Sequence, residues 1–309
     1  MNDRPRASDP PDLAEYQRLL ALLDERRFEE AQVRGRVLLE SADVGRRVAA
    51  RTHNLICWTY IEGLKRAAPE AVLHGEEAVS LAAAVGEHTL QVQAMFNLAS
   101  AYYQMGDYPL ARSTYREITT LLAADPELVP FGQVIARQGL AQLDMVAGQA
   151  ESALAHLEAA VLLCEREEPG TILAELHRRR ALVLLELDRP QDAAAALTAV
   201  DEYAFSPGPR GLWWRTHLGF TRARVELALG RVIQTRPLAI NTLALARELG
   251  DMPVVAECTC LLASIEWAEG RKEAPRRARL ALTHAIESGR RDVVANIRAR
   301  VKEILGDHL

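Results

Sequence analysis

The stretch Ala94–Leu122, AMFNLASAYYQMGDYPLARSTYREITTLL, decides the fold. It reads as two amphipathic helices joined by a tight turn around Gly106. This glycine supplies the left-handed backbone conformation that ends the first helix, and Asp107 provides an N-cap for the second. The small residues Ala99 and Ala111 let two antiparallel helices approach closely. The stretch therefore predicts a closely packed helical hairpin.

The same hairpin pattern recurs seven times along the chain. Each unit places a small residue shortly after its turn, in the role that Ala111 has in the stretch above. These marker residues follow one another at spacings of 40, 40, 42, 40, 42 and 39 residues: Ala31, Ala71, Ala111, Ala153, Ala193, Thr235 and Ala274. A repeated period of this length predicts a solenoid, in which each unit buries its apolar face against its neighbours.

The pattern divides the chain into three parts. Residues 1–11 are polar and rich in proline, and we expect them to be disordered. Residues 12–289 hold the seven hairpins. Residues 290–309 form a last helix that carries much charge, which is typical of the cap that keeps a solenoid end soluble.

Prolines predict two breaks inside the solenoid. Asp125-Pro126 and Pro130 follow the third unit, and Ser206–Pro209 follows the fifth. Proline removes a backbone donor and clashes with the preceding helical turn, so we expect the helices to stop at these places. The second break and the sixth unit, in which Thr235 replaces the expected alanine, are also the candidate hinges.

Composition favours a helical protein in the cytoplasm. Hydrophobic residues make up 49% of the chain but aromatic residues only 5%, and the net charge of −5 gives no support for non-specific nucleic-acid binding. The first residues lack the apolar core of a secretory signal, and no apolar run reaches the roughly 20 residues that span a membrane. The cysteines are expected to be buried free thiols: Cys57, Cys164, Cys258 and Cys260.

The small residue, Tyr, Gly-Asp-Tyr and Ala of residues 99–111 closely resemble the tetratricopeptide repeat (TPR). The period is longer than the usual 34 residues of that family. Similar longer repeats occur in helical domains of bacterial transcriptional activators and of peptide-responsive regulators from Gram-positive bacteria. The resemblance covers residues 12–289. It implies an all-α, right-handed superhelical solenoid whose first helices line a concave groove and whose second helices lie outside.

This resemblance assigns a set of ligand-binding candidates to the groove. Asn54 and Asn97 resemble the groove asparagines that hold peptide backbone in the peptide-responsive regulators, and an amide can both donate to and accept from an extended chain. Packing between helices is the alternative role for both. The other candidates in this half are neutral polar or aromatic residues: His53, Tyr60, Phe96, Ser100, Tyr103, Gln138 and Gln142.

The C-terminal half of the predicted groove is basic. Arg178, Arg179 and Arg180 begin one first helix, Arg222 and Arg224 follow one unit later, and arginine forks bind carboxylates bidentately. A peptide C-terminus or an acidic side chain is therefore one expected ligand. The alternative is that these arginines are solvated or pair within the chain, with Glu175 and Glu226.

The sequence offers no pattern for catalysis, a metal or a cofactor. It has no helical His-x-x-x-His pair, no glycine-rich phosphate loop after a strand and no serine nucleophile elbow. Every predicted helix is used by the repeat, which leaves none for a helix-turn-helix that would bind DNA directly. We expect a protein that is not an enzyme.

Three functional hypotheses follow. The first is an interaction scaffold or adaptor that holds a protein or extended peptide in its groove. The second is a cytosolic peptide-sensing regulator without a DNA-binding domain, in which the ligand changes the superhelical pitch and thereby partner binding. The third is self-association, with Trp213-Trp214 or the last helix as the contact.

Overall fold

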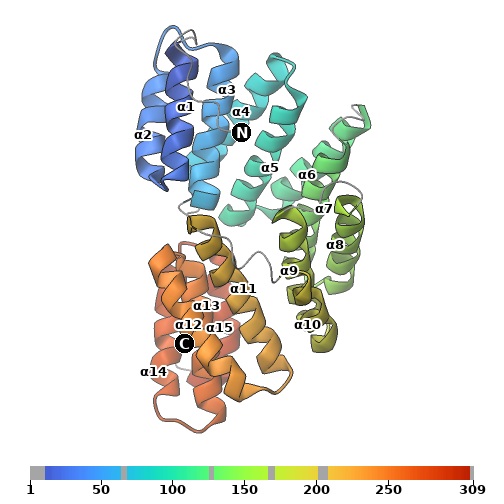
Figure 1. Cartoon of the computed structure of the whole chain (residues 1–309), viewed down its shortest axis with the longest axis vertical. Coiled ribbons are helices and arrows are strands. Elements are labelled where there is room, and N and C mark those ends of the chain that lie inside the picture. The colour runs from blue at the N-terminus through green and yellow to red at the C-terminus, as the bar shows by residue number, and fades with distance from the viewer. Residues whose placement is uncertain (1–10, 64–67, 125–128, 166–170, 201–207, 307–309) are drawn as a thin grey trace. The chain divides into compact units, whose positions relative to one another are not determined.

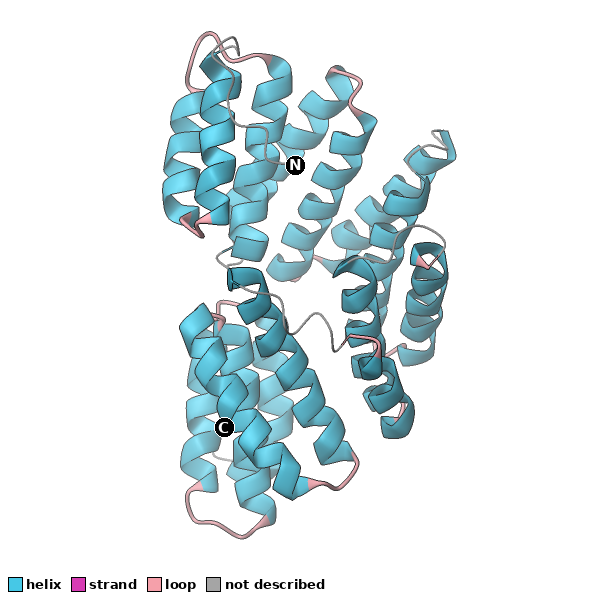
Figure 2. Ribbon diagram, viewed as in Figure 1, coloured by secondary structure: helices cyan, strands magenta, loops and turns pink. Residues whose placement is uncertain are grey.

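The computed structural model describes residues 11–63, 68–124, 129–165, 171–200 and 208–306, and these ranges contain helices and turns but no strand (Figures 1 and 2). The first helices of the hairpins are α1 (Pro11–Asp24), α3 (Arg46–Trp58), α5 (His88–Met105), α7 (Val129–Val146), α9 (Thr171–Glu186), α11 (Gly208–Ala228) and α13 (Met252–Ala268). The second helices are α2 (Phe28–Leu39), α4 (Pro69–Ala84), α6 (Tyr108–Ala124), α8 (Ala150–Cys164), α10 (Pro190–Thr198), α12 (Val232–Leu249) and α14 (Ala274–Glu287). A last helix, α15 (Arg291–Leu305), follows.

The turn around Gly106 forms as predicted. Gly106 has φ +82°, and the amide N–H of Asp107 donates to the carbonyl of Tyr102 at 2.9 Å, which closes the end of α5. The Asp107 carboxylate then accepts from the amide of Leu110 at 3.3 Å in the first turn of α6. At the corresponding turns without glycine, Arg26 and Asp188 adopt the same positive φ. The left-handed turn therefore forms even where another residue replaces the glycine.

The seven marker residues confirm the predicted register. Each is at most 1% exposed. Thr235 fills the place of alanine because its hydroxyl donates to the carbonyl of Arg231 one turn earlier, at 2.9 Å, so the polar group is satisfied inside the hairpin. Close contact between the two helices of each hairpin thus recurs through the chain.

The chain divides into two compact units, residues 1–139 and 140–309, with the boundary inside α7. In the second unit, α15 covers the end of the last hairpin. Val293, Ile297 and Val301 of α15 lie in one buried cluster with residues of α13 and α14. On the opposite side of α15, polar residues are exposed, which agrees with the expected capping helix.

Helices end before both predicted breaks, at Ala124 and Thr198, but two of the prolines belong to the helices that follow. Pro130 was expected to break the chain, but α7 begins at Val129 and includes it, and α11 begins at Gly208 and includes Pro209. Proline is tolerated in the first turn of a helix because its missing N–H has no intrahelical partner there. Pro11, the last residue of the predicted tail 1–11, is the first residue of α1. The other tail residues lie outside the described ranges, as do Asp125-Pro126 and Ser206-Pro207.

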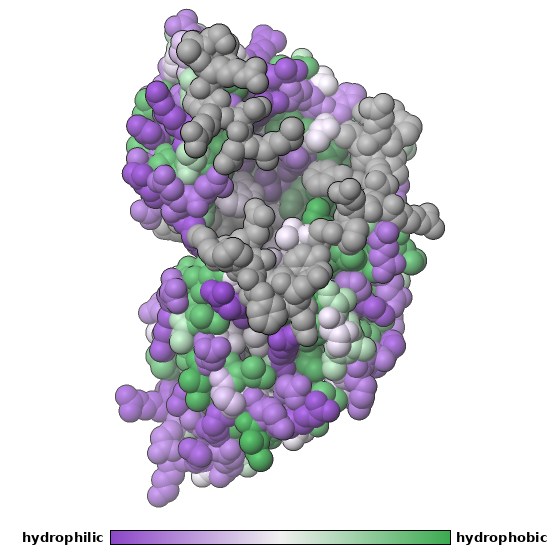
Figure 3. Space-filling model, in the orientation of Figure 1, coloured by the Kyte–Doolittle hydropathy of each residue, from purple (hydrophilic) through white to green (hydrophobic). Residues whose placement is uncertain are grey.

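The visible surface is mixed. Figure 3 shows hydrophilic residues interspersed with smaller apolar areas, as expected for helices that bury one face and expose the other. Among the described helices, none combines the length and the apolar character needed to cross a membrane.

Candidate functional site

Two asparagines join consecutive first helices in the first unit. Asn97 of α5 donates from Nδ2 to Oδ1 of Asn54 on α3, at 2.8 Å. Asn54 is half-buried and Asn97 is 7% exposed. The bond uses one of the two donors of Asn97 and one lone pair of Asn54, so the pair retains further donors and acceptors. Both expected roles are compatible with this geometry: the pair packs two helices together and still has groups that could bind a peptide backbone.

His53, next to Asn54, faces the second helix of its own hairpin. Its Nδ1 lies 2.9 Å from Nδ1 of His74 on α4. Burial lowers the pKa of His53. Burial, with further contributions from the positive charges of His53 and Arg36, lowers the pKa of His74 to about 4. At neutral pH the two rings are therefore uncharged, and one imidazole donates to the other.

The two candidate tyrosines of this unit are part of the packing. Tyr60 lies in the π-helical turn Thr59–Gly63 that extends α3, is 8% exposed, and accepts a hydrogen bond from Nη2 of Arg36 at 2.7 Å. Tyr103 is also buried, with its ring centroid 5.5 Å from that of Tyr108 at the start of α6. A second helix therefore contacts each of these side chains, α2 through Arg36 and α6 through Tyr108. The expected position of both tyrosines in the groove did not predict these contacts.

Phe96 and Ser100 of α5 both approach Tyr115 of α6. The Phe96 and Tyr115 ring centroids are 6.1 Å apart, and Ser100 Oγ lies 3.5 Å from the Tyr115 hydroxyl. Gly139 of α7 follows Asn97 by one repeat, and a Cβ placed there would lie 2.1 Å from the Tyr115 ring. The tyrosine ring therefore occupies the place where a third asparagine would continue the series. The neighbouring candidate Gln138 is half-buried.

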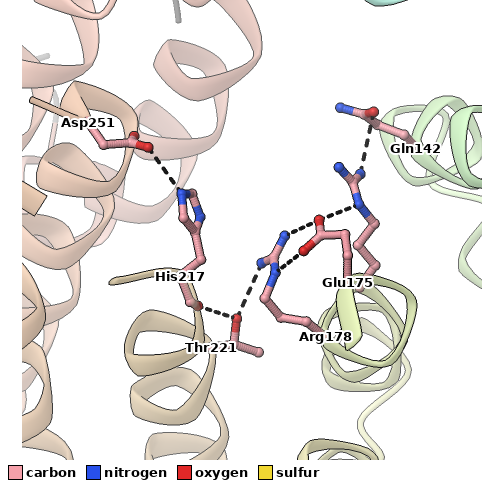
Figure 4. Close-up of polar contacts among 7 residues, drawn as sticks. Gln142, Glu175, Arg178, His217, Thr221 and Asp251 are labelled. Carbon is pink, nitrogen blue, oxygen red and sulfur yellow. Dashed lines mark hydrogen bonds and ion pairs between the residues drawn. The ribbon is translucent and has the colours of Figure 1, made fainter. Parts of the chain in front are cut away.

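In the second unit, Arg178 of α9 is tied into the structure (Figure 4). It is 8% exposed, and its Nε and Nη2 each donate to a different carboxylate oxygen of Glu175 at 2.7 Å. Its Nη1 reaches Thr221 of α11 at 3.4 Å, and its guanidinium lies 6.0 Å from the Trp213 ring centroid. Of the two roles expected for Arg178, the structure shows the pairing with Glu175.

Arg179 shares the same carboxylate. Its Nε donates to Glu175 at 2.7 Å, and its Nη1 approaches the amide oxygen of Gln142 on α7 at 3.5 Å. Burial alone would raise the pKa of Glu175, but Arg178 and Arg179 outweigh it and hold that pKa at about 2. Two guanidinium groups thus share one carboxylate, which leaves one positive charge in excess among these three residues, and Arg179 is the more exposed of the two arginines.

The polar contacts continue from α11 to α13 (Figure 4). Thr221 donates to the carbonyl of His217, and His217 Nε2 lies 3.1 Å from a carboxylate oxygen of Asp251. Asp251 is the N-cap of α13, where it accepts from the amide of Val254 at 3.2 Å. The ring of Trp213 lies 4.2 Å from that of His217, centroid to centroid. A connected set of polar groups therefore links α7, α9, α11 and α13.

Arg224 of α11 differs from the prediction in its partner. Its Nη2 bonds Glu186 of α9 at 2.7 Å, and its guanidinium lies 6.0 Å from the Phe220 ring centroid. The expected partner, Glu226, instead bonds Arg231. Glu186 lies 38 residues from Arg224, almost one repeat, so neighbouring first helices meet through this pair.

His74, Tyr115 and Asp251 were not among the expected site residues, whereas Arg179 was expected only as a member of a basic run in the groove. Arg179 had a signal, since it lies in the run of three arginines that begins at Arg178. His74 and Tyr115 belong to second helices, which the resemblance placed outside the groove, and a period cannot show which of their side chains reach inward. Among the described residues, no cluster of three or more His, Cys, Asp or Glu side chains is arranged to hold a metal.

Comparisons with known proteins show which fold this is. No protein-family model and no curated protein matches the chain. Among solved structures, the apo form of the quorum sensor NprR from B. thuringiensis superposes with a TM-score of 0.69 at 14% identity, over 88% of this chain and 76% of that one. Apo RapI gives 0.65 at 11% identity, over 95% of this chain and 100% of that one. A Rap protein complexed with competence and sporulation factor gives 0.60 at 15% identity, over 96% and 76%.

Proposed function

From the all-α, TPR-like solenoid fold that this chain shares with those proteins, we propose that it is a non-enzymatic peptide-binding adaptor. The ligand is an extended peptide or a segment of a protein. It binds along the first helices of the N-terminal unit, and the amides of Asn54 and Asn97 hold its backbone. The proposed location is the cytoplasm, with no direct contact to nucleic acid or membrane.

The observation that carries the proposal is the hydrogen bond between Asn97 and Asn54. It places two amides at equivalent positions of consecutive first helices, α3 and α5, separated by one repeat. An extended peptide exposes backbone donors and acceptors along its length, and two amides that are fixed relative to each other can meet them without first losing side-chain freedom. The mutual hydrogen bond supplies that fixation.

Two of the structural neighbours support the proposal that this chain binds a peptide. One was solved in complex with competence and sporulation factor, and the other is a quorum sensor. The quorum sensor favours a variant of the proposal, in which this chain senses a peptide and then changes its superhelical pitch and its partner. Small-angle X-ray scattering separates the two variants, because a sensor changes its radius of gyration when the peptide is added and an adaptor keeps it.

A selection experiment tests the binding proposal without a known ligand. An mRNA-displayed library of random heptapeptides is passed over the immobilised full chain, and the enriched sequences are counted after several rounds. The same selection is run on the Asn54→Ala/Asn97→Ala variant. The matched control is Asn296→Ala, which removes an exposed amide of α15 that donates to Glu257 at 2.7 Å.

The proposal expects a family of related peptides from the wild type and from the control, and loss of that family from the double variant. The same peptides from all three proteins would move the site away from the asparagines. A wild-type selection that never converges would contradict peptide binding itself.

A further inference from the structure

The second helix of the first hairpin, α2, exposes a face that is apolar in the middle and acidic at both ends. This face carries Glu29, Val33, Val37 and Glu40, at intervals of four, four and three residues. Such intervals keep side chains on one side of a helix. Val33 is 57% exposed and Val37 is 63% exposed, so most of each valine side chain is open to solvent.

The last helix, α15, repeats this spacing with the opposite charge. Arg291, Ala295, Ala299 and Lys302 follow one another at the same intervals, and all four are exposed. Arg298 lies on the same side of the helix and adds a third cation. The other side of α15 is buried against α13 and α14. Position by position, α15 has a base where α2 has an acid, and an alanine where α2 has a valine.

The charges at the ends of the two faces gain little within the chain. Among the described residues, the side chains of Glu29, Glu40, Arg291 and Lys302 form no hydrogen bond or ion pair. Glu40 is the C-cap of α2, and Arg291 is the first residue of α15. The C-terminal end of a helix disfavours an anion, and the N-terminal end disfavours a cation. A partner of opposite charge would therefore stabilise both residues.

We propose that α15 of one copy of this chain packs against α2 of a second copy. The identical spacing permits either direction, and the helix ends decide between them. Antiparallel packing places Arg291 beside Glu40 and Lys302 beside Glu29, so that each helix end meets an end of opposite polarity. Parallel packing would bring two helix N-termini together and leave the helix dipoles aligned side by side, which is unfavourable. The contact is therefore antiparallel.

The middle of the proposed contact is apolar. In the antiparallel arrangement Val33 lies level with Ala299, and Val37 lies level with Ala295. The small alanines let the two helices approach closely, and the larger valines fill the space between them. Arg36 also lies on this side of α2, but its guanidinium donates to a tyrosine hydroxyl of the same unit and is half-buried.

The size of the two faces sets the strength that we expect. Two single helix faces bury less than the roughly 1,200 Å² of a stable protein complex, so the association should be weak, with a Kd of about 100 µM at low salt. The four end charges are exposed, so added salt should screen them and weaken the contact further.

The tryptophans offer no comparable surface for self-association. Trp214 is 3% exposed, and the ring centroid of Trp213 lies 4.9 Å from that of Trp214 and 4.2 Å from that of His217. Of the two contacts considered for self-association, the last helix is therefore the better supported. It involves neither Asn54 nor Asn97, so this proposal and the proposed peptide site fail separately.

Sedimentation velocity of the full chain, at concentrations from about 5 to 500 µM, tests the proposal with two charge-reversed variants. One is Glu29→Lys/Glu40→Lys, and the other is Arg291→Glu/Lys302→Glu. The sedimentation coefficient of the wild type should rise with concentration at low salt, and much less in about 0.5 M NaCl. Each variant alone should stay monomeric, because its two faces then carry the same sign of charge. An equimolar mixture of the two variants should associate again, because each then meets faces of opposite charge on the other.

The matched control is Glu151→Lys/Glu248→Lys, which makes the same change of charge as the α2 variant at exposed residues of α8 and α12. It should associate as the wild type does. Circular dichroism checks that every variant keeps the helix content of the wild type. A wild-type sedimentation coefficient that does not depend on concentration, variants that each associate like the wild type, or a mixture that stays monomeric would each overturn the proposal.

Discussion

The shared carboxylate of Glu175 should make the C-terminal unit sensitive both to mutation and to acid. The pKa of Glu175 falls from 4.5 to about 2 because Arg178 and Arg179 overcome the effect of burial. A tenfold change in a protonation equilibrium corresponds to about 1.4 kcal/mol, so the charged carboxylate contributes about 3 kcal/mol to the free energy of unfolding. Since the folded pKa is the lower one, this stability is fully present above pH 4.5. It is lost as the pH falls towards 2.

Glu175→Gln therefore removes the negative charge while nearly keeping the shape of the side chain. The guanidinium groups of Arg178 and Arg179 then have no carboxylate of Glu175 to pair with. Thermal unfolding at pH 7, followed by circular dichroism, should show a lower midpoint for the variant. For a unit of 150–250 residues, a loss of about 3 kcal/mol corresponds to roughly 6–12 °C. The difference between the variant and the wild type should narrow steadily as the pH is lowered from 4.5 towards 2.

The matched control is Glu158→Gln. Glu158 of α8 lies 3.6 Å from Arg180, and its side chain is 49% exposed. A solvated pair of this kind contributes less than about 1 kcal/mol, so the control should unfold within a few degrees of the wild type. A variant Glu175→Gln that melts with the wild type at pH 7, or a difference that stays constant down to pH 2, would refute the charge argument.

Three further predictions concern packing and thiols. Gly139→Ala should destabilise the N-terminal unit by about 1–3 kcal/mol in urea unfolding, because its Cβ would lie 2.1 Å from the Tyr115 ring. The same change should cost clearly less in a Tyr115→Ala background, although Tyr115→Ala alone removes a buried ring and costs about 3–5 kcal/mol. Ala111→Leu should cost about 1–3 kcal/mol in the same assay, since Ala111 is fully buried between α5 and α6, and an unchanged midpoint would contradict the register. Of the four thiols, Cys164 alone should react rapidly with Ellman's reagent in the native protein. Cys57 and the pair at 258 and 260 are buried, with the pKa of Cys57 raised to about 12 by burial, so rapid release of more than one equivalent would be inconsistent with this packing.

The sequence was sufficient for the fold because the repeat carries its own register. A small residue near 40-residue intervals is a local requirement of close helix contact, and all the marker positions are buried. Pro130 and Pro209 were predicted as parts of helix breaks, and the structure places them in the first turns of α7 and α11, because a proline can follow the end of one helix or lie at the start of the next.

The site was harder to predict because the repeat period shows on which face of a helix a residue lies, but not which side chain it contacts. Asn54 and Asn97 were identified as equivalent positions, but nothing in the sequence showed that they bond each other. Arg178 was expected at a ligand site or paired with Glu175, and only the structure showed how completely that carboxylate engages it. Tyr115 reaches Gly139 from a second helix. Such contacts depend on side-chain direction across hairpins, which spacing alone does not give.

The central claim is that the asparagine pair of the N-terminal unit holds a peptide backbone. Its most direct test is the affinity of a selected heptapeptide, labelled with fluorescein and measured by anisotropy, for the wild type, for Asn54→Ala/Asn97→Ala and for Asn296→Ala. Each lost amide contact removes roughly 1 kcal/mol, so the account predicts that the double variant binds about 30-fold more weakly while the control is unchanged. Equal affinity for all three proteins would contradict it.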